Sequence, residues 1–178
     1  MERHRLLTPA VALLAVGCAA IGKTPTKDAC ERHQPEACDD LASEEIDVIH
    51  PGDDPTAIWR KYCELGGAQS CYEAASSLAS TKGETAETAE DLVVFAQRAC
   101  ARHVMAGCNT LAHYAKDAIH DCDLHDHERD TCAAAGVVWS RGVSVPPLNG
   151  PSFEPDAAKA HAAFAASCAA GAQVSCGK

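Results

Sequence analysis

CELGGAQSC, residues 63–71, is the stretch that decides this fold, because its two cysteines bracket seven residues and that spacing recurs along the chain. The other copies are CERHQPEAC (30–38), CARHVMAGC (100–108), CAAGAQVSC (168–176) and a looser one, CDLHDHERDTC (122–132), with nine intervening residues. Self-similarity of this kind is typical of repeat proteins. The sequence therefore predicts a repeated unit that is built around a cysteine pair.

The segments on either side of the cysteine pairs have the composition of helices. Runs without Gly or Pro precede the pairs at residues 57–62, 92–99 and 160–167, and such composition favours helix. Small or apolar residues recur three and four positions after the second cysteine, which places one closely packed stripe on a helix. Each unit is thus predicted to be a helix, a short turn and a second helix.

A disulfide across such a turn would staple an antiparallel helix pair at its hairpin end. It requires Cα atoms about 5.5 Å apart, and closing a loop of about nine residues contributes on the order of 2–3 kcal/mol. A zinc site would need closer spacings such as C-x2-C, which this chain lacks. We therefore predict five local disulfides. They are Cys30–Cys38, Cys63–Cys71, Cys100–Cys108, Cys122–Cys132 and Cys168–Cys176.

The eleventh cysteine, Cys18, follows a segment with the layout of an export signal. Basic residues near the start precede an apolar run and then small residues. Residues 1–17 therefore resemble the signal of a bacterial lipoprotein, and this resemblance implies a lipid on Cys18 and a tether over residues 18–29. The chain has Ala15 where such signals usually have Leu. The alternative is an ordinary secretory signal that is cleaved near Ala20.

The charge and the cysteine content restrict where the protein works. A formal net charge of −10 argues against nucleic acid and against anionic membrane surfaces as direct partners. Disulfides need an oxidising compartment, which export supplies. We expect a protein at the periplasmic or cell-surface face of a bacterial membrane, lipid-anchored in the first interpretation and soluble in the second.

The cysteine hairpins, with a small residue four positions after the second cysteine, resemble the Sel1-like repeat. They resemble more narrowly the Helicobacter cysteine-rich protein family, whose members are disulfide-stapled relatives of tetratricopeptide repeats. The match covers residues 54–178, best at CAAAGVVWSRGVSV (132–145) and 156–176, with a degenerate copy at 28–46. The resemblance implies an all-α fold, an α/α solenoid of short stapled hairpins.

The sequence departs from this family pattern in three places. Cys108 and Cys132 are only 24 residues apart, which predicts a short or missing first helix and an irregular segment over 119–131. The proline-rich segment 145–155 lengthens one connection, because its prolines forbid continuous helix. The last cysteine lies two residues before the end of the given sequence, so the final second helix should be a stub.

The leading functional hypothesis is a non-enzymatic scaffold that binds a protein or peptide partner in the cell envelope and needs no cofactor. Solenoids present a concave face to partners, here expected to be lined by the first helices of the hairpins. Polar residues on those helices are candidates for contacting an acidic ligand, although a solvated face is the alternative interpretation. They are Arg60, Lys61, Arg98 and Arg102.

Two further functions remain open at this point. The family resemblance implies a β-lactamase or penicillin-binding activity, but the sequence shows no nucleophile with a positioned base, which is the minimum for such chemistry. The stretch IHDCDLHDHERD (119–130) concentrates histidines among acidic residues, and His120, His125 and His127 could ligate Zn²⁺ or Cu²⁺. The alternative is a solvated acidic loop in which Cys122 is paired with Cys132.

Overall fold

The computed structural model describes residues 27–80, 85–124, 129–145 and 152–178, and the regular structure in these residues is helical. The all-α class predicted from the sequence is therefore confirmed. The helices are α1 (Lys27–Glu31), α2 (Pro35–Ile46), α3 (Thr56–Leu65), α4 (Ala68–Ser80), α5 (Ala86–Ala101), α6 (Met105–Leu124), α7 (Arg129–Arg141), α8 (Ala157–Ala169) and the 3-10 helix η2 (Gln173–Ser175).

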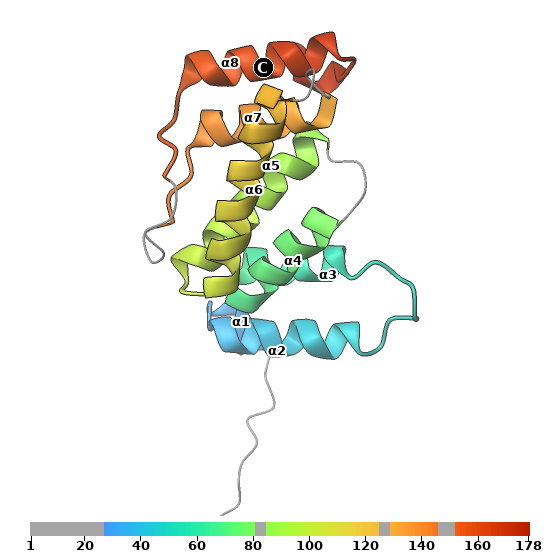
Figure 1. Cartoon of the computed structure of the whole chain (residues 1–178). Coiled ribbons are helices and arrows are strands. Elements are labelled where there is room, and N and C mark those ends of the chain that lie inside the picture. The colour runs from blue at the N-terminus through green and yellow to red at the C-terminus, as the bar shows by residue number, and fades with distance from the viewer. Residues whose placement is uncertain (1–26, 81–84, 125–128, 146–151) are drawn as a thin grey trace, which may run out of the picture.

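The helices pack on one another in chain order, from α2 at one end of the molecule to α8 at the other (Figure 1). Next-nearest neighbours also touch, because α2 contacts α4, α4 contacts α6 and α5 contacts α7. One apolar core runs from α3 to α8, and its largest fully buried side chains include Leu92, Leu111, Val137 and Val138. The many buried alanines around them let the helices approach closely.

Five disulfides join the same five cysteine pairs that the spacing in the sequence predicts. Their Cα atoms lie 4.5–5.0 Å apart, so the linked segments meet closely at each turn. Most of these cysteines are fully buried. The bonds are Cys30–Cys38, Cys63–Cys71, Cys100–Cys108, Cys122–Cys132 and Cys168–Cys176. Such a set indicates an oxidising environment, extracellular or periplasmic.

The four nine-residue turns share one backbone geometry as well as one spacing. In each, the third residue after the first cysteine has a positive φ; these residues are His33 (59°), Gly66 (121°), His103 (65°) and Gly171 (101°). The next N–H then donates to the carbonyl five residues earlier. The pairs are Gln34 to Ala29, Gly67 to Tyr62, Val104 to Ala99 and Ala172 to Ser167, at 2.8–3.1 Å. This is the Schellman closure of a helix C-terminus.

The two adjacent glycines of residues 63–71 have separate tasks. Gly66 takes the left-handed conformation of the turn, with a φ of 121°, which a glycine adopts without steric cost. Gly67 leaves space for a neighbour, because a Cβ there would lie 2.5 Å from Oδ1 of Asp39 and 2.7 Å from Oγ of Ser70. The second glycine therefore belongs to a contact between hairpins.

That contact is a helix cap supplied by the preceding hairpin. The first N–H groups of α4 have no acceptor within the helix, and Gly67 has no side chain to offer one. Asp39 of α2 accepts from the N–H of Gln69 at 3.0 Å and from the N–H and hydroxyl of Ser70 at 2.8 and 2.6 Å. The Asp39 carboxylate thus fixes α2 against the start of α4.

The short spacing between Cys108 and Cys132 has a different cause from the one expected. Helix α6 is 20 residues long and carries both Cys108 and Cys122, so the second helix of one hairpin continues as the first helix of the next. The expected irregular segment 119–131 is wrong in its described parts, because residues 119–124 belong to α6 and 129–131 to α7. Residues 125–128 lie outside the described residues.

The other two departures have counterparts in the structure. In the described part of the proline-rich segment, Phe153 exchanges two backbone hydrogen bonds with Val143, which forms an isolated antiparallel bridge. After the last turn only the single 3-10 turn η2 follows, in place of a full second helix. Residues 1–26, including Cys18 and most of the expected tether, lie outside the described residues.

We predict that Asp39→Ala lowers the free energy of unfolding by about 1–3 kcal/mol, because it leaves the buried Ser70 hydroxyl and two N–H groups without their acceptor. Urea unfolding of the oxidised protein measures the change. Asp40→Ala is the matched control, because Asp40 is the exposed neighbour on the same helix and should change stability by less than about 0.5 kcal/mol. Equal effects of the two substitutions would contradict the capping role.

Candidate functional site

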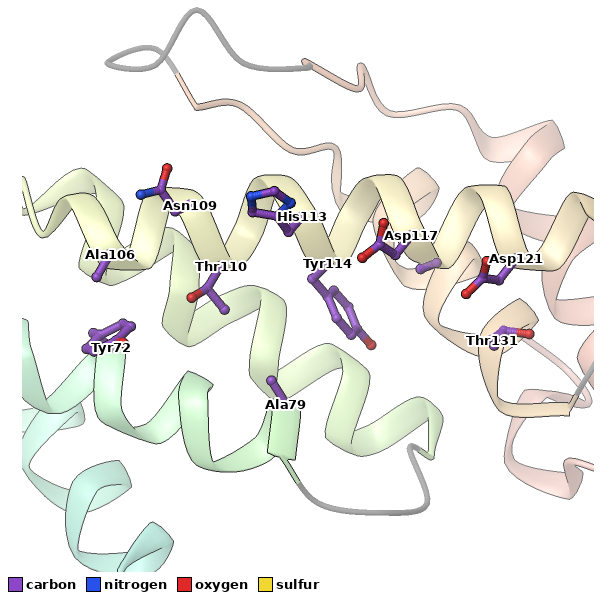
Figure 2. A pocket seen from close by; sticks show the side chains of 11 residues that line it. Tyr72, Ala79, Ala106, Asn109, Thr110, His113, Tyr114, Asp117, Asp121 and Thr131 are labelled. Atoms are coloured by element: carbon purple, nitrogen blue, oxygen red, sulfur yellow. The ribbon is translucent and has the colours of Figure 1, made fainter.

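An open groove with a volume of about 780 Å³ lies between α4, α6 and the start of α7 (Figure 2). We call it the α4–α6 groove. Its lining consists of Tyr72, Ala79, Ala106, Asn109, Thr110, His113, Tyr114, Asp117, Ala118, Asp121 and Thr131. Helix α6 contributes eight of these residues, so one face of a single long helix forms most of the site.

The α6 face carries a polar row at helical spacing. Asn109, His113, Asp117 and Asp121 follow one another at intervals of four residues, which places them on one side of the helix. The first three side chains are exposed. Asn109, His113 and Asp117 have no hydrogen-bond or ion-pair partner among the described residues, so an amide, an imidazole and a carboxylate are available to a ligand.

The opposite side of the groove is formed by α4 and is more apolar. Tyr72 and Ala79 lie two turns apart on this helix, across from Thr110 and Tyr114 of α6 (Figure 2). Tyr72 and Tyr114 are half-buried, so each exposes part of a ring. Ala79 and Ala106 leave room between the helices because their side chains are short. The groove therefore combines aromatic surface with a row of hydrogen-bonding groups.

The charged residues of the groove gather at one end. Asp117 and Asp121 lie toward the C-terminal end of α6, beside Thr131, whereas Tyr72 and Ala106 lie toward the other end (Figure 2). No lysine or arginine is among the described lining residues. The groove is therefore neutral at one end and negative at the other.

The first helices α3 and α5 do not line this groove, in contrast to the expectation for the concave face. Helix α6, which does line it, is the second helix of one hairpin and the first helix of the next. Arg60 of α3 forms an ion pair with Asp91 of α5 and stacks over the Phe95 ring at 5.6 Å. Lys61, the next residue, points to α2 instead, where its Nζ lies 2.6 Å from a carboxylate oxygen of Glu45. These two cations tie α3 to different neighbours.

The other two candidate cations lie on and after α5. Arg98 is exposed on α5. Arg102 follows the helix end and donates from Nη1 to Sγ of Cys71 at 3.2 Å. Three of the four predicted cations thus engage neighbouring helices, and none of the four lines the α4–α6 groove.

The histidine stretch is only partly within the described residues. His120 is exposed on α6, with its Nδ1 3.2 Å from Oδ1 of Asp121. Cys122 is bonded to Cys132 and has no thiol to offer a metal. His125 and His127 lie outside the described residues. No three His, Cys, Asp or Glu side chains come together in the described part of the chain in a way that could hold a metal ion.

A second, smaller hollow of about 340 Å³ lies between the end of α6, α7 and α8. Alanines form much of its surface, with Trp139 as the largest side chain. Lys159 lies over the Trp139 ring, with Nζ 4.1 Å from the ring centre. This hollow offers fewer hydrogen-bonding groups than the α4–α6 groove.

Comparison with protein-family models, curated proteins and solved structures found no match to this chain. The family resemblance of the sequence therefore remains an expectation. No helix in the described residues is both long and apolar enough to span a membrane.

The groove residues escaped the sequence analysis, although a signal was present. Asn109, His113, Asp117 and Asp121 form a regular polar row that could be read as one exposed helix face. Such a row usually marks solvated surface, and only the packing of α4 against α6 turns it into the side of a groove. The sequence pattern did not indicate that one helix, α6, continues through Cys122 and so carries the whole row.

The contact of Lys61 with Glu45 also makes stability depend on pH. Hydrogen bonds from Lys61 and then from the Tyr62 hydroxyl, at 2.8 Å, hold the pKa of Glu45 below its ordinary value of 4.5. A carboxyl group with a lowered pKa in the folded state stabilises the protein above its ordinary pKa. This contribution is lost as the pH falls through the folded-state pKa.

We therefore predict that Glu45→Gln reduces the free energy of unfolding at pH 7 by at most about 1 kcal/mol, because both partners are partly exposed. The difference from the wild type should shrink as the pH falls from about 5 to about 3. Urea unfolding at a series of pH values measures it, with the exposed Glu44→Gln as control. A difference that persists at the lowest pH would contradict the assignment.

Proposed function

We propose that this protein is a non-enzymatic binding scaffold that holds an extended peptide segment of a partner protein in the α4–α6 groove. The observation that carries the proposal is the polar row of α6, in which the amide of Asn109, the imidazole of His113 and the carboxylate of Asp117 have no partner among the described residues. An extended peptide has unpaired N–H and C=O groups along its length, and such a row can satisfy them. The half-buried rings of Tyr72 and Tyr114 would contact its side chains.

The dimensions of the groove suit a short segment. From Ala106 to Asp121 the α6 axis covers about 22 Å, at a rise of about 1.5 Å per residue. An extended chain advances about 3.3 Å per residue, so about seven residues would lie along the groove.

We further infer that the helices form a short α/α solenoid of Sel1-like units. The support is the common closure of the four nine-residue turns and the packing of helices on their nearest and next-nearest neighbours. Stacked units of this kind depend on their neighbours for a shared core. The partner would then meet a rigid surface, because the disulfides fix the hairpin on either side of the groove.

The proposed place of action is the periplasmic or cell-surface face of a bacterial membrane, with a lipid on Cys18 as the anchor. The five disulfides and the signal-like residues 1–17 support export. We predict that the wild-type chain incorporates radiolabelled palmitate in bacterial cells and that Cys18→Ala abolishes the labelling, whereas Cys30→Ala/Cys38→Ala, which removes a disulfide pair, retains it. Equal labelling of the wild type and Cys18→Ala would exclude Cys18 as the lipidated residue.

Peptide binding can be tested by selection from a displayed library of random heptapeptides on the oxidised full-length chain. Ala79→Trp places a large ring on the α4 side of the groove, and we expect it to abolish the enrichment. Ala158→Trp is the matched control, because Ala158 is exposed on α8 and outside the groove, and it should retain the enrichment. No enriched peptides, or equal enrichment on Ala79→Trp, would refute the proposed function.

A further inference from the structure

We propose that the α4–α6 groove selects segments with an arginine or lysine side chain, which lies at the groove end formed by Asp117 and Asp121. This inference rests on the proposed function and adds the chemistry of the partner. Its first support is charge complementarity. Asp117 and Asp121 are the carboxylates of the described lining, and Lys116, the only lysine or arginine of α6, does not line the groove.

The second support is the electrostatics of α6 itself. The C-terminus of a helix carries a partial negative charge, which favours basic residues in the last turn. The last turn of α6 has no basic residue and contains Asp121 and Asp123. Asp117 and Asp121 are also a like-charge pair four residues apart, which destabilises a helix. A cation at this end of the groove would relieve both unfavourable interactions.

The third support is an aromatic ring in the same groove as the carboxylates. Tyr114 lies one turn before Asp117 on α6 and lines the same groove, and its half-buried ring extends beneath the helix (Figure 2). A guanidinium or ammonium group is attracted to the face of a tyrosine ring as well as to carboxylates. The neutral end of the groove, around Tyr72 and Ala106, would hold the uncharged part of the segment.

The test compares two pools of acetylated and amidated fluorescent heptapeptides on the oxidised full-length chain. The pools are otherwise random and differ at one fixed position, which is arginine in one pool and its uncharged analogue citrulline in the other. Seven pairs of pools place this residue at each position in turn. We expect the arginine pool to bind about tenfold more tightly by fluorescence polarisation, at the positions near one end of the peptide.

Two double variants separate the local effect from the overall charge. Asp117→Asn/Asp121→Asn should bring the ratio of the arginine and citrulline affinities close to one. Asp40→Asn/Glu44→Gln removes the same number of charges from exposed positions on α2 and should leave the ratio unchanged. The arginine preference of the wild type should also fall as the salt concentration rises, since ions screen exposed charges.

The outcomes distinguish this inference from the proposed function. If the arginine and citrulline pools bind the wild type equally well and neither binds the Ala79→Trp variant, the charge preference is overturned and the peptide groove stays in place. An arginine preference that Asp117→Asn/Asp121→Asn does not reduce would overturn the assignment of the two carboxylates. Failure of every pool to bind would overturn both proposals.

Discussion

The left-handed turn that closes each nine-residue cysteine loop is the constraint on which the structure depends. Only 4% of the residues are aromatic, and alanine is the most frequent residue of the core and buries little apolar area per residue. A core of this kind holds short helices together only weakly. The Schellman closure reverses the chain within a few residues, and the disulfide keeps the two helices in contact there.

Polar contacts between hairpins then decide how the units stack. Asp39 joins α2 to the start of α4, Arg60 joins α3 to Asp91 of α5, and Glu90 of α5 pairs with Arg141 of α7 and with Lys178. Each contact links elements that are distant in sequence. Alanine faces alone would allow neighbouring helices to slide, because small side chains interlock poorly. Directional hydrogen bonds and ion pairs favour one alignment.

The sequence predicted the parts of this fold that are local. The cysteine spacing predicted the hairpins, because a disulfide across a nine-residue loop brings the ends of that loop together independently of the rest of the fold. The sequence could not show that α6 continues through Cys122. The short separation of Cys108 and Cys132 is equally consistent with one continuous helix and with a hairpin that lacks its first helix. The α4–α6 groove was missed for the same reason. It depends on which face of a 20-residue helix meets α4, and that face is set by packing between units.

The groove lies between α4 and α6 and not on α3, whose polar residues are used within the stack. Arg60 and Lys61 of α3 are engaged with Asp91 and Glu45, so their charges stabilise the stack. The α6 face makes no such contacts at Asn109, His113 and Asp117 within the described chain. Because α6 joins two hairpins and has a disulfide near each end, its polar row is held rigid. A rigid row loses little conformational entropy when a segment binds, which is the property that a binding scaffold requires.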